Sequence, residues 1–350
     1  MERNDVRMNK AKIGFIGCGT HATNNLYPML AYTRAELVAV CDLDEQLAHR
    51  NAALYGASSV YTDAGRMLDE QQLDGVIIVG PSAVHYSLGM QALTRGIAVF
   101  TEKPPAPRLA QAEEMVAVAR AGGTFLMTGY MKRHGLPYKK ARQLIDSGLF
   151  EPAVGHFKYG HWGNDNLNEM LLTMSSHIID LAISFFGEPI GVTSTIYETG
   201  RTISLAAVLH FRSGQWAQLT LDSSQPRIQE RVELSGSIDG DNALIVVDNV
   251  QQMELHRQGH HGIDLLKPEL YEIEPTFDLA DIQMWRPDYG IPNMGQTRHF
   301  VQGFAGELRE FVDAIIERRQ PYPGTDDVLK AMRVIDAIAA RPNGYSDLQP

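Results

Sequence analysis

The sequence predicts an α/β protein with a doubly wound parallel sheet in its first third. A second α/β domain with a large open, mostly antiparallel sheet is expected to follow. Three observations lead to this fold class. A glycine-rich turn follows the first apolar strand, at Gly17. From residue 12 to 128, nearly unbroken apolar strands alternate with helical patterns, as in a parallel sheet covered on both faces. After residue 129 the strands alternate polar and apolar positions, which is typical of an antiparallel sheet with one covered face.

The first strand, 13–16, leads into a turn with the spacing G-x-G-x-x-A. Gly17 tolerates the unusual backbone dihedrals that such a turn requires. Gly19 has no Cβ, so that a pyrophosphate can approach the backbone, and the small Ala22 lets the next helix pack on the strand. The N–H groups at the start of that helix attract phosphates. The residues expected to contact a dinucleotide here are Gly17, Gly19, Thr20, His21 and Ala22.

The second strand, 37–41, ends at Asp42. Asp42 follows the glycine turn at close to the roughly 20-residue interval of the carboxylate that binds adenosine ribose hydroxyls. A carboxylate at this place repels a 2′-phosphate, so the sequence favours NAD over NADP. The alternative is that Asp42 only opens a solvated turn, together with Asp44 and Glu45.

The rest of this half continues the alternation. Helices are expected at 45–55, 64–70, 85–95 and 110–121, and strands at 60–61, 75–79, 97–100 and 125–127. Ligands of doubly wound sheets lie beyond the carboxyl ends of the strands. Two such ends carry polar groups, and they add Pro81, His85, Glu102 and Lys103 to the expected cofactor contacts.

Lys103 is the first candidate for chemistry. Pro104 disfavours a helical backbone at Lys103, which helps to hold its side chain in one direction. Burial lowers and a nearby carboxylate raises the pKa of a lysine, so its proton affinity can be adjusted. A solvated lysine at a strand end is an equally good interpretation of its position alone.

Length, charge and cysteine content narrow the class of protein. At 350 residues the chain is long for one core, so we expect two domains, 1–128 and 129–350. A formal net charge of −11, spread along the chain, argues against sequence-independent nucleic-acid binding. We expect no membrane span, because no apolar stretch approaches roughly 20 residues, and no signal peptide. Cys18 and Cys41 exclude a disulfide framework and fit a cytoplasmic protein.

The second half places a helix at about 169–186 between its first two strands. Thr173, His177 and Asp180 share one face of this helix. His177 is the best general acid/base after Lys103, since an imidazole near its usual pKa can accept a hydroxyl proton. Asp180 is expected to orient His177 or to balance its charge. Position alone would rather indicate a structural histidine in the core.

Other segments carry weaker signals. The basic stretch 132–142 is expected to be mostly a solvated helix face. The polar loop 163–168 offers Asn164 and Asp165 as substrate contacts, with Tyr130 and Thr173, or is an ordinary connection. The two adjacent histidines at 260–261 are interpreted as part of an exposed turn rather than as metal ligands, and we expect no metal. The segment 285–299 is a candidate cover of the site, and helices at 307–318 and 326–338 are expected to pack.

Several of these motifs together resemble the Gfo/Idh/MocA family, which contains glucose–fructose oxidoreductase and inositol dehydrogenase. They are Gly17-Cys-Gly19, Pro28, Asp42, His85, Glu102-Lys103-Pro104, Gly129-Tyr130 and Trp285-Arg-Pro287. The resemblance implies an NAD(P)-dependent oxidoreductase whose Lys103 contacts the reacting hydroxyl and the nicotinamide. It also implies a homodimer or homotetramer formed through the open face of the second sheet.

One position departs from the family pattern. The family usually has aspartate four residues before the histidine and glycine just before it, where this chain has Thr173 and Ser176. Threonine can hydrogen-bond a sugar hydroxyl but cannot act as a base at neutral pH. Three outcomes are open: catalysis by Lys103 and His177, a substitute carboxylate from Asp165 or Glu169, or lost activity.

The sequence as a whole favours a cytoplasmic dehydrogenase. It would transfer a hydride between NAD and a secondary alcohol of a sugar, polyol or sugar derivative, with Lys103 positioning the hydroxyl and His177 as base. The alternatives are a catalytically impaired sensor of dinucleotide and sugar, and a glycosidase that uses NAD transiently.

Overall fold

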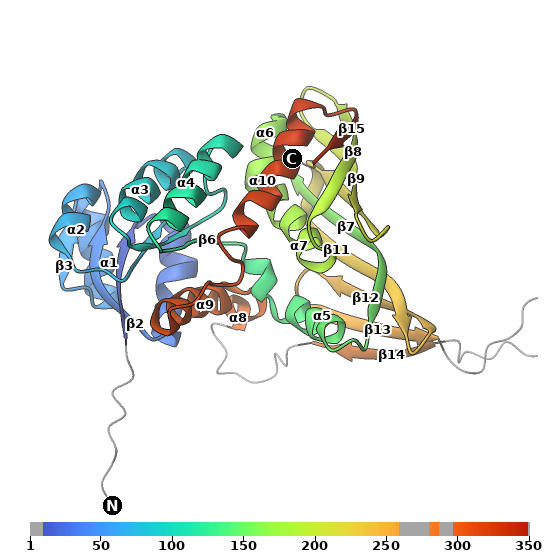
Figure 1. Cartoon of the computed structure of the whole chain (residues 1–350), viewed down its shortest axis with the longest axis horizontal. Coiled ribbons are helices and arrows are strands. Elements are labelled where there is room, and N and C mark those ends of the chain that lie inside the picture. Colours follow the sequence, from blue (N-terminus) through green and yellow to red (C-terminus); the bar gives the residue numbers. More distant parts are fainter. Residues whose placement is uncertain (1–9, 259–279, 287–296, 349–350) are drawn as a thin grey trace, which may run out of the picture.

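The computed structural model describes residues 10–258, 280–286 and 297–348. The pair 260–261 and most of the candidate cover, 287–296, lie outside these residues. Figure 1 shows a parallel sheet with its helices at one end of the molecule and a second sheet at the other. Helices from the C-terminal part of the chain lie between the two sheets. The predicted α/β class is confirmed.

The first sheet has six parallel strands in the order β3-β2-β1-β4-β5-β6. Helices cover both faces, so β4 and β5 are buried at every position and β1 at every position but Lys12. The order reverses between β1 and β4, and this is where a doubly wound sheet opens a crevice for ligands. The strands are β1 (Ala11–Ile16), β2 (Ala35–Cys41), β3 (Ser59–Tyr61), β4 (Gly75–Ile78), β5 (Ala98–Thr101) and β6 (Leu126–Thr128). The helices are α1 (Glu45–Tyr55), α2 (Ala64–Glu70), α3 (Ser82–Thr94) and α4 (Leu109–Ala121).

The connection after β1 differs from the regular helix that the sequence predicted. It consists of a π-helical turn, η1 (Ala22–Leu26), followed by a 3₁₀ segment, η2 (Tyr27–Tyr32). Pro28 lies in the first turn of η2, and proline has no N–H to donate to an earlier carbonyl. The apolar side chains still face inward, since Leu26 and Met29 are fully buried.

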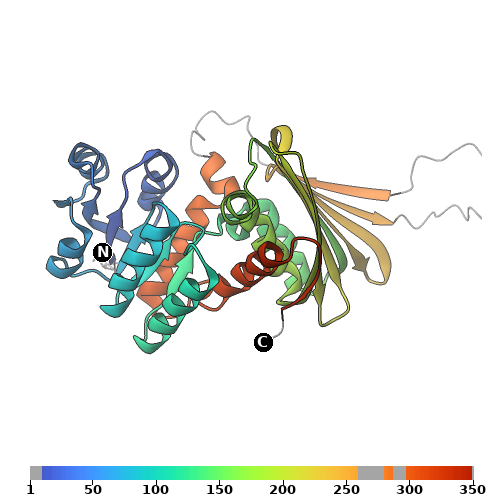
Figure 2. The same ribbon diagram turned by 90° about the horizontal axis from the view of Figure 1, so that it is seen from above.

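The second sheet has nine strands in the order β14-β13-β12-β11-β7-β10-β9-β8-β15. Every pairing is antiparallel except that between β10 and β7. Figure 2 shows helices against one face of this sheet and none, among the described residues, against the other. The strands are β7 (Glu151–Trp162), β8 (Pro189–Glu198), β9 (Ile203–Phe211), β10 (Trp216–Asp222), β11 (Ser224–Ile238), β12 (Asp241–Asp248), β13 (Gln252–Gln258), β14 (Ala280–Trp285) and β15 (Gly344–Asp347).

A long apolar helical segment covers the inner face of this sheet. It is formed by α6 (Leu167–Met170), the π-helical η4 (Leu171–Ser175) and α7 (Ser176–Phe186), and it ends at Gly187 with φ 91°. The expectation that no stretch is apolar enough to span a bilayer was wrong, because 167–186 has a mean hydropathy of 1.3 over such a length. Its hydropathy has a simpler cause in this fold: 67% of that window is buried against the protein, as in a core helix.

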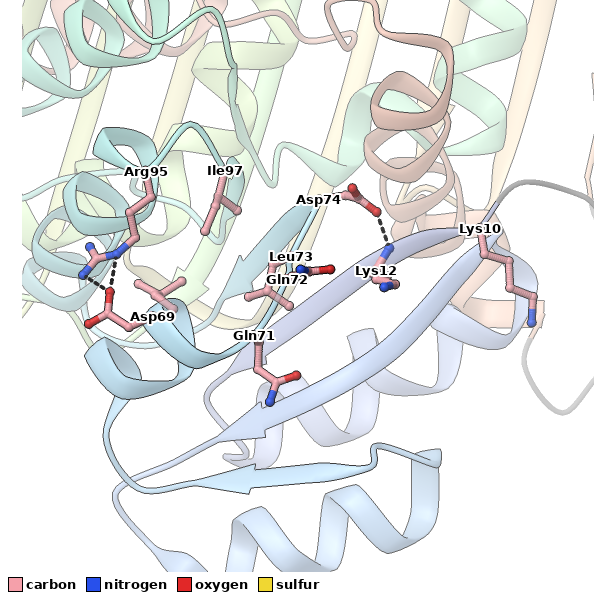
Figure 3. A pocket seen from close by; sticks show the side chains of 10 residues that line it. Lys10, Lys12, Asp69, Gln71, Gln72, Leu73, Asp74, Arg95 and Ile97 are labelled. Atoms are coloured by element: carbon pink, nitrogen blue, oxygen red, sulfur yellow. Dashed lines mark hydrogen bonds and ion pairs between the residues drawn. The ribbon is translucent and has the colours of Figure 1, made fainter.

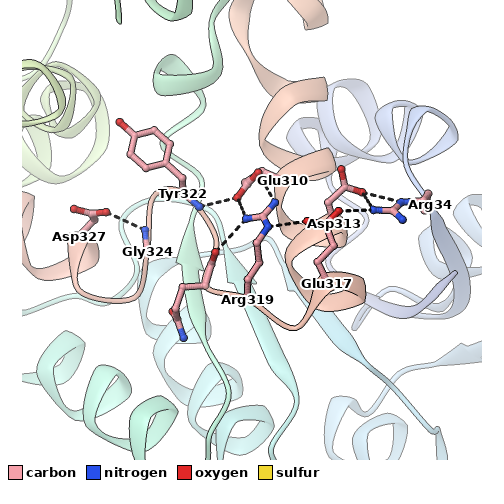
Figure 4. Close-up of polar contacts among 9 residues, drawn as sticks. Arg34, Glu310, Asp313, Glu317, Arg319, Tyr322, Gly324 and Asp327 are labelled. Carbon is pink, nitrogen blue, oxygen red and sulfur yellow. Dashed lines mark hydrogen bonds and ion pairs between the residues drawn. The ribbon is translucent and has the colours of Figure 1, made fainter. Parts of the chain in front are cut away.

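The chain then returns to the first sheet. The helix α9 (Phe304–Glu317) packs its apolar face on the parallel sheet, where Phe311 meets Phe100 and Phe125 edge to face. Ion pairs hold its outer face to the rest of the domain. Figure 4 shows one of them, in which Asp313 accepts two hydrogen bonds from Arg34. The remaining helices are η3 (Met131–His134), α5 (Leu136–Asp146), α8 (Thr297–Gln302) and α10 (Asp327–Ala340).

Candidate active site

The glycine turn has the shape that its sequence predicted. Gly17 has φ +103°, and a Cβ at this position would lie 2.1 Å from the carbonyl oxygen of Val79. Only glycine fits there. A Cβ on Gly19 would meet no atom within 4 Å, so the backbone of Gly19 faces open space. Thr20 and His21 are exposed beside it, and Ala22 is buried under the turn. The turn is therefore free to receive the phosphates of a dinucleotide.

A cavity of about 540 Å³ lies beside this turn, at the carboxyl ends of β1, β2 and β4. Asp42 lines it together with Gly17 and Pro81. The Asp42 carboxylate is held in place by two backbone N–H groups, those of Cys18 at 2.6 Å and Asp44 at 2.9 Å. Asp42 thus anchors the turn and also faces the cavity, which is the arrangement expected of a ribose-binding carboxylate.

His85 does not line this cavity. Its imidazole is fully buried; Nε2 accepts from the Gly80 N–H at 3.0 Å, and Nδ1 lies 2.8 Å from the carbonyl oxygen of Pro104. Because Nε2 accepts, the ring is neutral and Nδ1 donates; burial also lowers the pKa of His85. His85 therefore joins two strand-end loops through its ring nitrogens, and its contact with the cofactor stays a prediction.

A second cavity lies at the opposite edge of the same sheet, before the amino ends of the strands (Figure 3). Lys10, Lys12 and Arg95 line it, but Arg95 is paired with Asp69, and Asp74 accepts from the backbone N–H of Lys12 at 2.8 Å. Ligands of parallel sheets bind at the carboxyl ends of the strands, so this cavity, at the amino ends, is not a candidate for the cofactor or substrate site.

Lys103 leaves the end of β5 and reaches the helical segment that covers the second sheet. Its Nζ donates to the carbonyl oxygen of Thr173 at 2.5 Å. Burial lowers the pKa of Lys103, while the negative charge of Glu102 opposes this shift and Lys132 adds to it. Glu102 accepts from the Lys103 backbone N–H at 3.2 Å, and its Oε1 lies 3.1 Å from Nε2 of His21. Lys103 is thus half-buried and bound to the protein rather than fully solvated.

His177 lies one turn after Thr173 and is buried. Within the described residues its Nδ1 has no hydrogen-bond partner. Burial keeps the pKa of His177 well below its usual range, and the nearby positive groups Lys103 and Lys132 lower it further. The ring of Tyr130 meets that of His177 edge to face, with centroids 6.5 Å apart. The structure therefore brings Lys103, Tyr130, Thr173 and a neutral His177 together.

The other expected substrate contacts are placed differently. Both carboxylate oxygens of Asp180 accept from Arg133, at 2.7 and 2.8 Å, so the expected contact between Asp180 and His177 is replaced by a buried ion pair. The Thr173 hydroxyl donates to the Glu169 carbonyl at 2.6 Å. Asn164 accepts from the backbone N–H of Asn166, which shapes its own loop. Asp165 and Glu169, the candidate substitute carboxylates, are exposed.

The basic stretch after Gly129 was predicted to be mostly solvated, and for its first members this was wrong. Lys132 contacts the carboxylate of Glu230 on β11, and Arg133 is paired with Asp180. All four side chains are buried. Their partners lie far away in the sequence, so no local pattern signals these pairs. Lys139 and Lys140, one turn further on, are exposed as predicted.

These features define a class of protein: a dinucleotide-dependent oxidoreductase, with candidate reactive groups between the parallel sheet and the second sheet. Comparison with known families agrees. A model described as "Oxidoreductase family, NAD-binding Rossmann fold" matches residues 11–130, and one described as "Oxidoreductase family, C-terminal alpha/beta domain" matches residues 149–343. The chain belongs to the Gfo/Idh/MocA oxidoreductase family, and its cofactor is NAD. The predicted resemblance is confirmed.

Individual relatives share only a minor part of their residues with this chain. The chain is 30% identical to D-apiose dehydrogenase of Paraburkholderia graminis over 217 residues, which cover 57% of this chain and 55% of that relative. It is 24% identical to myo-inositol 2-dehydrogenase of Thermotoga maritima over 277 residues, 72% of this chain and 80% of that one. Among solved structures, a dehydrogenase from Chromobacterium violaceum superimposes with a TM-score of 0.83 at 26% identity, covering 95% of both chains.

Proposed function

We propose that the chain is an NAD-dependent dehydrogenase that moves a hydride between the nicotinamide and a secondary alcohol of a sugar, polyol or sugar derivative. Membership of the oxidoreductase family and relatives named as apiose and inositol dehydrogenases support the substrate class. The observation that carries the proposal is the hydrogen bond from Lys103 Nζ to the Thr173 carbonyl, one turn before His177. It attaches Lys103, from the end of β5, to the helical segment that carries His177.

The chemistry follows from the charges of these two groups. Bound NAD supplies the hydride acceptor. The Lys103 ammonium orients the substrate hydroxyl by hydrogen bonding and favours the alkoxide that forms as the proton leaves. His177 is neutral in the free protein, because burial and the nearby cations oppose its protonation, and the same effects make it a weak base. Its Nδ1, which has no partner among the described residues, therefore accepts a hydrogen bond from the substrate hydroxyl and takes the proton only as the hydride leaves the same carbon. On this proposal, neither step requires the carboxylate that Thr173 replaces.

The proposal is tested by offering the purified protein a panel of sugars and inositols, with NAD and NADP run side by side. We expect NADH absorbance to rise with at least one neutral sugar or polyol, and more slowly or not at all with NADP. A protein that binds NAD but forms NADH with no member of the panel would contradict a dehydrogenase function of this kind.

Cofactor preference gives a first prediction. Asp42→Asn keeps an oxygen to accept from the Cys18 N–H but removes the negative charge at the ribose end of the cavity. We expect the ratio of kcat/KM for NAD to that for NADP to fall by about tenfold or more, which corresponds to about 1.4 kcal/mol. Asp44→Asn is the matched control, since Asp44 caps α1 through backbone N–H groups and asparagine caps equally well. An unchanged ratio in Asp42→Asn would remove Asp42 from the cofactor site.

The uncovered face of the second sheet supports a proposal on assembly. The strand β9 alternates strictly between buried residues and half-buried ones, and the half-buried residues are Ser204, Ala206, Val208 and His210. We propose that this face joins two or four copies of the chain. We also propose that the enzyme is cytoplasmic and that its two domains divide between residues 128 and 129. The mass in solution, measured by light scattering, tests it: a monomer at micromolar concentration would contradict this assembly.

A further inference from the structure

One carboxyl group near the site has no role in the chemistry described so far. Glu307 lies on the inner face of α9, and its side chain is 0% exposed. Neither of its oxygens has a hydrogen-bond partner among the described residues. An ionised carboxylate in such surroundings is strongly disfavoured, because it has lost its water and gained no partner. Glu307 is therefore in its protonated, uncharged form in the folded protein.

The charged group nearest the first turn of α9 is Glu102. His21, whose Nε2 lies 3.1 Å from Glu102 Oε1, meets the ring of Phe304 with centroids 6.0 Å apart. Phe304 precedes Glu307 by one turn of α9. Burial first, and the negative charge of Glu102 second, raise the pKa of Glu307 well above its usual value. Burial alone would also raise the pKa of Glu102, but the hydrogen bond with His21 and the charge of Lys103 lower it below its usual value. The two carboxyl groups therefore hold one proton and one negative charge between them, with the charge on Glu102.

Other titratable groups on the elements packed against α9 are engaged elsewhere. On η3, Lys132 contacts Glu230, Arg133 binds Asp180, and the buried His134 is neutral, with its pKa lowered to about 4 by burial. On α8, His299 lies 2.8 Å from the Asn24 carbonyl and Arg298 binds Gln302. On η2, Tyr27 contacts Cys18 and Tyr32 packs on Phe300. Lys12 of β1 lies at the opposite edge of the sheet. None of them gives Glu307 a counter-ion.

We propose that Glu307 is a positioning residue of the active site: it stays protonated behind Glu102, so that Glu102 alone carries negative charge beside Lys103. The arrangement matters because Glu102 sits between two functional elements. It binds the backbone N–H of Lys103 and the ring of His21 next to the glycine turn. A second negative charge at Glu307 would raise the proton affinity of Lys103 and repel Glu102 from this position.

The first test measures stability and needs no substrate. The unfolded chain ionises Glu307 above about pH 4.5, whereas the folded protein does not, so the wild type loses stability as pH rises from there toward the folded pKa. Glu307→Gln is uncharged at every pH and lacks this loss. The Tm of Glu307→Gln minus that of the wild type should therefore grow by about 2–4 °C between about pH 5 and pH 8. The exposed Glu113→Gln is the control, with a flat difference. A flat difference for Glu307→Gln would overturn the proposal.

The second test asks whether Glu102 is the partner. In a Glu102→Gln background the like charge is gone, so the pH-dependent gain from Glu307→Gln should shrink measurably, but by less than half, because burial is the larger cause of the raised pKa of Glu307. An undiminished gain would show that burial alone keeps Glu307 neutral, and would overturn its link to the site. If Glu307→Gln does not fold, Glu307→Met provides the same uncharged comparison.

The third test rests on the proposed role of Lys103. As the wild-type Glu307 ionises at alkaline pH, it raises the pKa of Lys103, so the alkaline limb of kcat/KM should lie at lower pH in Glu307→Gln, by roughly half a unit or more. Coincident limbs would overturn the effect on Lys103. A protein without dehydrogenase activity leaves the two stability tests intact, so that failure of the proposed function is distinguishable from failure of this inference.

Discussion

Lys103→Met lowers kcat by roughly two orders of magnitude or more, while the dissociation constant for NAD stays within about threefold of the wild type. Methionine keeps the length and the apolar stem of the side chain but removes the ammonium group. The hydrogen bond to the Thr173 carbonyl and the favourable charge beside the reacting hydroxyl are then both lost. The glycine turn and Asp42, which hold the other end of the dinucleotide, are untouched.

The measurements are NADH formation under saturating substrate and an NAD titration followed by protein fluorescence. Lys140→Met is the matched control, because Lys140 is exposed on α5 and should leave both quantities unchanged. A Lys103→Met protein that turns over at the wild-type rate would reject the role of this lysine. Equal losses of turnover and NAD affinity would assign it to cofactor binding alone.

The parts of this molecule that the sequence predicted are those with a local cause. A buried parallel strand needs a continuous apolar run, and the turn after β1 needs glycine where a Cβ would strike the Val79 carbonyl. Lys103 and His177 were predicted separately, from a strand end and from a helix face. Their convergence beside the nicotinamide stays a prediction; the bond from Lys103 to the Thr173 carbonyl attaches Lys103 to the helical segment that carries His177.

The parts that it missed depend on distant partners. The cations of Lys132 and Arg133 look like a solvated face until the folded chain brings Glu230 and Asp180 to them. Glu307 looks like a polar position of an amphipathic helix, and only the return of α9 to the first sheet buries it. Asp180 was expected to orient His177 or balance its charge because the two residues share a helix. In the fold its carboxylate instead binds the guanidinium of Arg133 on η3.

Asp180→Asn should lower the free energy of unfolding by about 3 kcal/mol or more. The substitution keeps the shape of the side chain but leaves the buried Arg133 guanidinium without its bidentate carboxylate. The remaining acid nearby is Asp327, whose Oδ2 lies 3.7 Å from Nη1 of Arg133. Urea unfolding of the variant and the wild type provides the measurement, and Glu70→Gln, which breaks the exposed pair with Arg66, should cost less than about 1 kcal/mol.

The same variant separates the two interpretations of Asp180. If Asp180 holds η3 against α7, as its contacts with Arg133 indicate, the folded variant retains its turnover at a temperature well below its Tm, and the combined Arg133→Met, Asp180→Leu protein regains much of the lost stability. If Asp180 instead orients His177, stability changes little, kcat falls and its pH profile shifts. The burial of both charged side chains and the two short hydrogen bonds between them lead us to expect the first result.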